Sequence, residues 1–274
     1  MASSSASSAT SLSDVEQQGV NFALQVIGRE NVTLKEKQMQ VLRTVIVEKK
    51  DTLAVLPTGF GKSLIYQLMA PFADFVESGF RPTESNSIVL VVSPLNALIR
   101  DQVTKLRECG LKACILKVDR VALDGEGDDG ERVCISESLE NLKNFQLIYA
   151  HPEALVENKA VMQLLKTNEF QRRVRAIVVD EAHLVVDWYV NFIIYSWWSL
   201  ILHRGFWTPH ISVILITTFC KCGVNVINKK INPITLLHTI GDLLAENNTY
   251  LRHSSSKCFS LMPHVCPWRA FDCL

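Results

Sequence analysis

The stretch TLAVLPTGFGKS at residues 52–63 has the residue types and spacing of a loop that holds phosphate. Its two glycines would let successive backbone N–H groups turn inward at the start of a helix, where the helix dipole also favours an anion. Lys62 would reach the β- and γ-phosphates of a nucleotide, and the Ser63 hydroxyl would hold Mg²⁺. The loop consists of Pro57, Thr58, Gly59, Phe60, Gly61, Lys62 and Ser63. Because the strict pattern has glycine where this chain has Leu56, a glycine-rich strand–helix turn with an incidental Lys-Ser pair stays open as an alternative.

Two adjacent acids follow an apolar run at residues 176–179. A site that hydrolyses a nucleoside triphosphate needs one carboxylate to hold Mg²⁺ through its waters and a second to take a proton from the attacking water. Neighbouring residues at the end of a strand point in different directions, so Asp180 would face the metal and Glu181 the water. A solvated strand end is the alternative. Together with the phosphate loop on an earlier strand, the pair indicates an ATP- or GTP-binding site.

These residues need elements that bring them together, and short apolar runs alternate with helical patterns through the first two thirds of the chain. Strands are predicted at 52–56, 87–92, 113–117, 147–150 and 176–179, and helices at 14–27, 34–48, 62–75, 95–109 and 152–166. Capping boxes at 13–16 and 33–36 would start the first two helices. Short apolar strands between helices are typical of a parallel sheet buried on both faces. The predicted fold class is therefore α/β, a doubly wound and mostly parallel sheet with helices on both faces. The Gly- and acid-rich stretch 119–132 is predicted to be a surface loop.

Charge and composition divide the chain into two unlike parts. The 274 residues include 28 basic and 28 acidic side chains, which gives none of the net positive charge usual in a nucleic-acid binder. Residues 1–188 hold 21 Lys and Arg against 25 Asp and Glu, whereas residues 189–274 hold 7 against 3 and four of the five tryptophans. High apolar content with few Gly and Pro excludes collagen, coiled coil and a wholly disordered chain.

Several features bear on location and on metals other than magnesium. The Ser/Ala-rich start has no apolar core and no arginine before Arg29, so we expect neither a secretory signal nor a mitochondrial transit peptide, and an intracellular location. The eight cysteines are irregularly spaced and are expected to be reduced. Zinc binding by Cys220 and Cys222, or by Cys258, His264 and Cys266, is a weaker alternative.

A nearly all-apolar run at 184–202 approaches the roughly 20 residues that span a bilayer. It is interrupted by Asp187 and Asn191, and no membrane is expected as a partner. A membrane anchor stays open as the least favoured alternative.

Several motifs in order resemble one helicase family. Asp180–His183 is a DEAH box, and Leu56–Ser63 resembles the phosphate loop of superfamily-two helicases. The flanking sequence is similar to that of RecQ-type DNA helicases: Val92–Gln102 (VSPLNALIRDQ) looks like their motif Ia and Tyr149–Glu153 looks like their motif Ib. Gln38 lies where that family keeps a motif-zero glutamine, whose carboxamide can both donate to and accept from the adenine edge. For Gln38, an exposed helix residue is the alternative.

The resemblance covers residues 33–188. It implies a RecA-like domain that binds ATP, Mg²⁺ and one strand of DNA. It implies an ATP-dependent 3′–5′ DNA helicase that acts on single-stranded DNA or on a single/double-strand junction. The implied process is DNA repair and recombination, and the implied location is nuclear or cytoplasmic. The implied roles are catalysis for Lys62 and Glu181, metal binding for Ser63 and Asp180, DNA contact for Ser93, Asn96 and Pro152, and coupling of ATP to DNA for His183 and Trp188. His151 departs from the small hydroxyl residue that the family has there.

The resemblance stops near Trp188, and the aromatic-rich loop of the family does not continue beyond it. The stretch 209–218 could be the strand that carries the family's next motif, with Thr217 in it. We therefore expect a Ser-rich leader and helix at 1–32, a helicase lobe at 33–188, and a divergent Cys- and Trp-rich tail at 189–274 that need not form an independent domain.

Two functions follow from this division. The first is a RecQ-type helicase that is incomplete, because the family's second RecA-like lobe supplies a catalytic arginine and the residues after 188 are too few for it. The alternative is a non-catalytic ATP- or DNA-binding module that competes with a full-length helicase. The abrupt change in composition also suggests that the tail is not native helicase sequence, as a retained intron, a frameshift or an alternative end would produce.

Overall fold

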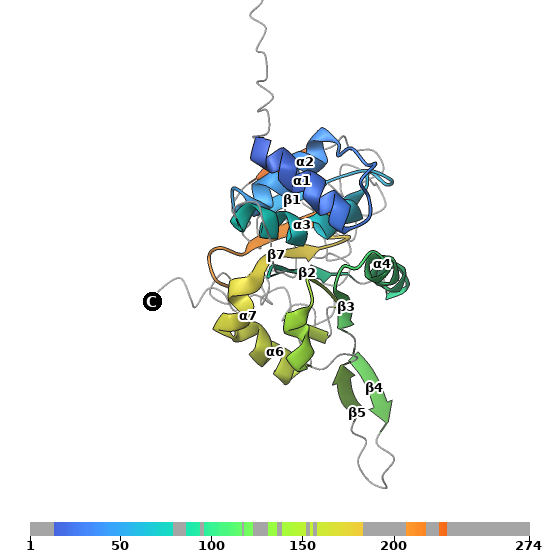
Figure 1. Cartoon of the computed structure of the whole chain (residues 1–274). Helices are drawn as coiled ribbons and strands as arrows, with labels where there is room; N and C mark the ends of the chain where they lie inside the picture. The colour runs from blue at the N-terminus through green and yellow to red at the C-terminus, as the bar shows by residue number, and fades with distance from the viewer. Residues whose placement is uncertain are drawn as a thin grey trace, which may run out of the picture.

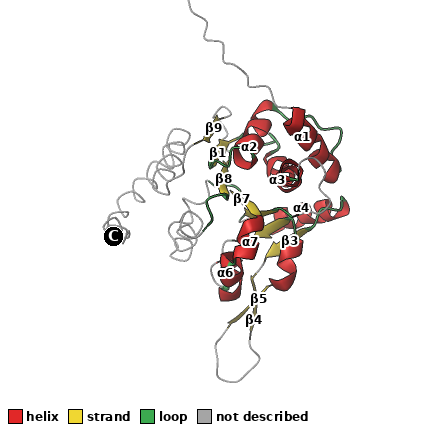
Figure 2. Ribbon diagram, turned by 60° about the vertical axis from the view of Figure 1, so that its left-hand side comes forward, coloured by secondary structure: helices red, strands yellow, loops and turns green. Residues whose placement is uncertain are grey.

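The computed structural model describes residues 14–78, 86–93, 96–116, 118–122, 131–135, 139–151, 154–155, 158–182, 207–217 and 225–228. Seven strands form one sheet in the order β3-β6-β2-β7-β8-β1-β9. They are β1 (Thr52–Val55), β2 (Ile88–Val92), β3 (Ala113–Leu116), β6 (Leu147–Ala150), β7 (Val174–Val179), β8 (Ser212–Thr217) and β9 (Asn225–Asn228). The first six strands in that order are parallel to one another, and β9 pairs with β1 in the antiparallel sense. Figure 2 shows β9, β1, β8 and β7 side by side.

Helices cover both faces of the sheet, as a parallel sheet requires. Along the six parallel strands, alternate residues enter two separate apolar clusters, such as Ala54 in one and Val55 in the other. The first cluster is covered by α1 (Asp14–Val26), α2 (Glu36–Ile46), α3 (Lys62–Glu77) and α4 (Asn96–Glu108). The second is covered by the 3₁₀ helix η1 (Leu139–Asn144), α6 (Lys159–Lys166) and α7 (Asn168–Arg173). The predicted α/β, doubly wound fold is confirmed (Figure 1).

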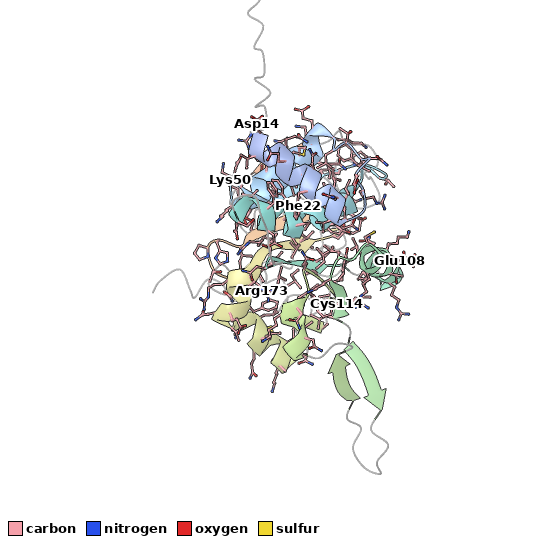
Figure 3. The ribbon with its side chains drawn as sticks, in the orientation of Figure 1. Asp14, Phe22, Lys50, Glu108, Cys114 and Arg173 are labelled. Atoms are coloured by element: carbon pink, nitrogen blue, oxygen red, sulfur yellow. The ribbon has the colours of Figure 1, made fainter. Side chains whose placement is uncertain are left out.

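The helices α1 and α3 pack closely because small and aromatic residues face each other. Gly19 of α1 lies over Phe72, so that a Cβ at this glycine would come within 3.0 Å of the ring. The ring of Phe22 points toward α3, where its centroid is 5.4 Å from that of Phe75 (Figure 3). This contact places α1 over α3, the helix that follows the phosphate loop.

Three local predictions differ from the structure. The helix predicted at 152–166 is interrupted, because Asn158 is extended and its Oδ1 caps α6 by accepting from Ala160 N and Val161 N. The N-cap of α2 is Lys35, two residues after the predicted Thr33, and its backbone N donates to Oε1 of Gln38 at 2.8 Å. The stretch predicted as a surface loop contains β4 (Val118–Ala122) and β5 (Glu131–Ile135), which pair as an antiparallel hairpin that projects from the sheet in Figure 1.

The strand predicted at 209–218 is present as β8, and it fills the position between β7 and β1. Its start is held by Asp51, whose Oδ1 accepts from Val213 N at 2.9 Å, and by Ser212, whose Oγ donates to Val45 O at 3.1 Å. Its end is held by Leu56, whose backbone N donates to Thr217 O at 3.0 Å. Two strands from beyond Trp188 thus belong to the same sheet as the phosphate loop.

We expect Asp51→Ala to lower the free energy of unfolding by about 1–3 kcal/mol, because a buried N–H of β8 loses its acceptor. Asp51→Asn keeps an acceptor oxygen in the same place and should lose less. Urea unfolding followed by circular dichroism measures both, with Glu108→Ala as the control for removing an exposed carboxylate. A loss for Asp51→Ala no greater than that for Glu108→Ala would contradict this role.

Candidate active site

The candidate site lies at the carboxyl ends of parallel strands, where open α/β sheets hold their ligands. β1 leads into the loop before α3, and β7 ends directly before the acid pair. β8 separates β1 from β7 and is in register with both, so Val55 pairs with Thr217 while Val179 pairs with Leu215. The loop and the acids are therefore brought to one edge of the sheet, one strand apart.

The phosphate loop depends on left-handed glycines. Gly59 has φ +75° and Gly61 has φ +90°, a region that other residues rarely adopt. Gly61 is the N-cap of α3 and, having no side chain, leaves the first-turn N–H groups without a side-chain cap. A Cβ at Gly61 would lie 2.6 Å from Nε2 of Gln38. The geometry fits an anion-binding helix start, and glycine is the residue that fits at position 61.

Gln38 holds this loop from α2. Its Nε2 donates to Phe60 O at 2.9 Å and to Gly61 O at 3.3 Å, while its Oε1 accepts from Lys35 N at 2.8 Å. Lys35 also reaches the loop, because its Nζ lies 4.4 Å from the centroid of the Phe60 ring. The side chain of Gln38 is buried, which is unlike the exposed helix residue weighed as its alternative. A contact with adenine stays a prediction; here the carboxamide holds the backbone of the phosphate loop.

The acid pair meets the loop through an ion pair. Nζ of Lys62 lies 3.2 Å from Oε1 of Glu181, and both side chains are mostly buried. Glu181 has φ +50°, an unusual conformation for a residue with a side chain, and it turns the glutamate away from the line of β7. The backbone N of Glu181 donates to Oδ1 of Asp180 at 3.0 Å. The two carboxylates thus point to different groups, Asp180 to Tyr66 and Glu181 to Lys62, while their roles toward a metal and a water stay predictions.

Asp180 is only 4% exposed, and its pKa is raised to about 6, with burial as the largest cause. The nearby charge of Glu181 contributes to the rise, whereas hydrogen bonds from Tyr66 and from the Glu181 N–H, and the charge of Lys62, oppose it. A divalent cation beside this carboxyl would favour its charged form. The carboxylate of Asp180 and the hydroxyl of Ser63 offer the hard oxygen ligands that Mg²⁺ prefers, so these residues fit that ion.

A set of buried hydroxyl and amide groups is linked to Asp180 through Tyr66, and no role was predicted for it from the sequence. Tyr66 OH lies 3.1 Å from Oδ2 of Asp180 and 3.1 Å from Oε1 of Gln102, and Tyr149 OH lies 2.9 Å from the same Oε1. Nε2 of Gln102 donates to Oγ of Ser63 at 3.3 Å. Burial raises the pKa of both tyrosines, so both phenols stay protonated near neutral pH. The signal in the sequence was weak: a tyrosine in an apolar run needs a partner for its hydroxyl.

The residues predicted to face DNA are only partly described. Ser93 directly follows β2 and is 2% exposed, with its backbone N donating to Ala150 O. Asn96 begins α4. His151 follows β6, half-buried. Pro152, His183 and Trp188 lie outside the described residues, and their predicted roles stay predictions.

Two alternatives from the sequence concerned zinc and a membrane. Among the described residues, no group of three or more His, Cys, Asp or Glu side chains is placed to hold a metal ion. The candidate zinc residues from Cys220 onward lie outside that part of the chain. No helix in the described part is long and apolar enough to cross a bilayer.

Known proteins resemble the chain over the same region. ATP-dependent DNA helicase hus2/rqh1 of Schizosaccharomyces pombe is 36% identical over 144 residues, which are 52% of this chain and 10% of the relative. Probable ATP-dependent DNA helicase RecS of Bacillus subtilis is 32% identical over 160 residues, covering 58% of this chain and 27% of the relative. The mouse bifunctional 3'-5' exonuclease/ATP-dependent helicase WRN is 28% identical over 160 residues, or 58% of this chain and 10% of that protein. The chain thus spans only a small part of the length of these relatives.

Solved structures show the same fold. The crystal structure of DUF1998 helicase MrfA bound to DNA superposes with a TM-score of 0.51 at 16% identity, covering 76% of this chain and 27% of that chain. The family model for DEAD/DEAH box helicases matches residues 35–217, which include β8 as well as the phosphate loop and the acid pair. The chain therefore belongs to the DEAD/DEAH box helicase family, and its predicted resemblance to RecQ-type helicases is confirmed.

Proposed function

We propose that this chain binds ATP with Mg²⁺ and hydrolyses it, as the ATP-binding lobe of a DEAH-box, RecQ-type 3′–5′ DNA helicase. The observation that supports the proposal is the ion pair at the carboxyl ends of the strands, in which Nζ of Lys62 lies 3.2 Å from Oε1 of Glu181. The neighbouring residues Asp180 and Ser63 are hydrogen-bonded to Tyr66 and Gln102, respectively. A phosphate-binding lysine, a candidate base and two oxygen ligands for a metal are the parts that triphosphate hydrolysis needs.

Each side chain has one role in the proposed reaction. The free N–H groups at the start of α3 and the ammonium of Lys62 bind the phosphates. Asp180 and Ser63 would hold Mg²⁺, which when bound neutralises charge on the phosphate oxygens. Glu181 takes the proton of the attacking water. Gln38 keeps the loop in its binding shape through Phe60 and Gly61, and the adenine contact implied for this residue belongs to the proposal.

DNA is the proposed partner, since the names of several relatives call them DNA helicases. Ser93, Asn96 and Pro152 are the proposed contacts to the DNA backbone, and His183 and Trp188 the proposed coupling residues. A nuclear place of action and a role in DNA repair and recombination follow from the same family. The proposed lobe runs from residue 33 through β8, because that strand completes the pairing of β1.

We expect Lys62→Ala to abolish measurable ATP binding, because the phosphates lose their cation. Glu181→Gln should bind ATP about two- to five-fold more tightly, since Lys62 no longer has to leave an ion pair. The same change should lower the hydrolysis rate about 10²–10⁴-fold by removing the base. Fluorescence anisotropy of a labelled ATP analogue and a phosphate-release assay, each with and without single-stranded DNA, measure these effects. Binding that survives in Lys62→Ala would refute the site.

We expect Gly61→Ala to weaken ATP binding at least about ten-fold, a loss of roughly 1.4 kcal/mol. A Cβ there would meet Gln38 Nε2 at 2.6 Å, so the loop or the glutamine must move. Gly110→Ala is the matched control, because Gly110 also has a positive φ, +86°, but nothing within 4 Å of its Cβ position. The control should lose about 1–2 kcal/mol of stability without a change in ATP affinity. Equal affinities in the two variants would contradict the assigned role of Gly61.

A further inference from the structure

A buried polar cluster joins four elements behind the proposed magnesium ligands. Ser63 and Tyr66 come from the first two turns of α3, Gln102 from α4, Tyr149 from β6, and Asp180 from the end of β7. The rings of Tyr66 and Tyr149 meet edge to face, with centroids 6.2 Å apart, and both side chains are fully buried. Gln102 hydrogen-bonds three of the other four members, namely Ser63, Tyr66 and Tyr149.

The number of protons in the cluster determines which bonds form together. Tyr66 has one hydroxyl proton but two acceptors at 3.1 Å, Oδ2 of Asp180 and Oε1 of Gln102. Tyr149 gives its own proton to Oε1 of Gln102 at 2.9 Å. An amide oxygen can accept two hydrogen bonds, so Oε1 of Gln102 can hold Tyr149 and still compete with Asp180 for the proton of Tyr66. The position of the Gln102 amide therefore bears on the orientation of the Tyr66 hydroxyl, although it does not touch Asp180 itself.

The nitrogen of the same Gln102 amide forms a hydrogen bond with Ser63. Nε2 of Gln102 donates to Oγ of Ser63 at 3.3 Å and so fixes the rotamer of that hydroxyl. One side chain thus sets the orientation of a group at each of the two oxygen ligands, directly at Ser63 and through Tyr66 at Asp180. Partners of this kind, one bond behind a metal ligand, orient the ligand and tune its affinity.

The structure assigns Gln102 as a positioning residue that holds Ser63 and the Tyr66–Asp180 pair in the arrangement that takes Mg²⁺ with ATP. This inference rests on the proposed function and names a residue to which no role in that function has been given. Ile99 and Val103 lie on either side of Gln102 in α4 and are buried in the core, so the amide is held on a rigid helix. A movement of α4 relative to α3 would shift the amide against both ligands.

The test compares the Mg²⁺ requirement of ATP binding in the whole chain. A labelled ATP analogue is titrated with the wild type and with Gln102→Leu, which keeps a branched side chain at this position and cannot form hydrogen bonds. Titrations run in EDTA and at increasing Mg²⁺. We expect the Mg²⁺ concentration for half-maximal tight binding to rise about 10-fold or more in Gln102→Leu. The affinity in EDTA should change less than about two-fold, because Lys62 and the backbone N–H groups of the phosphate loop stay in place. Gln17→Leu, the same change on the exposed face of α1, is the control and should match the wild type.

A double-mutant cycle separates positioning from a general loss of packing. If Gln102 acts largely through Ser63, Gln102→Leu adds little to the Mg²⁺ requirement of Ser63→Ala, so the two effects are far from additive. Tyr149→Phe should raise the Mg²⁺ requirement by a smaller factor, since it removes one of the hydrogen bonds that hold the Gln102 amide in place. Full additivity in the cycle would overturn the assignment. Should Gln102→Leu fail to fold by circular dichroism, Gln102→Met is measured in its place with the same expectation.

The outcomes distinguish this inference from the proposed function. A wild-type chain that binds no ATP with or without Mg²⁺ would overturn both. Wild-type binding that is lost in Lys62→Ala, together with an unchanged Mg²⁺ requirement in Gln102→Leu, would overturn the inference alone. A raised Mg²⁺ requirement with unchanged affinity in EDTA supports it, because a loss of packing alone would weaken both.

Discussion

The parallel pairing of β1 with β8, and of β8 with β7, is the constraint on which the candidate site depends. A strand buried on both faces must satisfy its backbone groups on both edges, and β1 does so between β8 and β9. This pairing fixes the ends of β1 and β7 one strand apart, in register. The ion pair between Lys62 and Glu181 and the hydrogen bond from Tyr66 to Asp180 follow from that spacing.

Local chemistry made the central part of the site predictable from the sequence. The glycines before Lys62 and the two acids after an apolar run are each short patterns whose function needs no distant residue. The fold class followed in the same way from short apolar strands between helices. Element boundaries were less predictable where a polar side chain intervened: Asn158 caps α6 inside a stretch predicted as one helix. The hairpin β4–β5 was missed because its Gly- and acid-rich connection is typical of a surface loop.

The rest of the site was not predictable, because it depends on contacts between residues far apart in the sequence. Tyr66, Gln102 and Tyr149 are separated by dozens of residues, and no spacing links them. Gln38 was identified as a nucleotide contact, yet its bonds to Phe60 and Gly61 appear only once α2 is placed against the loop. The composition change after Trp188 suggested a separate tail, whereas β8 and β9 show that the sheet continues beyond it.

The position of β8 has a consequence for how the chain is made. The hydrogen bond from Val213 N to Asp51 joins residues 162 positions apart. The strand β1, which leads into the phosphate loop, therefore cannot pair with β8 until this much later part of the chain is present. Pairing over such separations slows folding and leaves apolar strand edges exposed for longer. During synthesis β1 leaves the ribosome long before β8, and until then the edges of β1 and β7 are open to aggregation. The phosphate loop is therefore synthesised before the strand that completes its sheet, and the site can form only after Thr217, the partner of Val55, has been made.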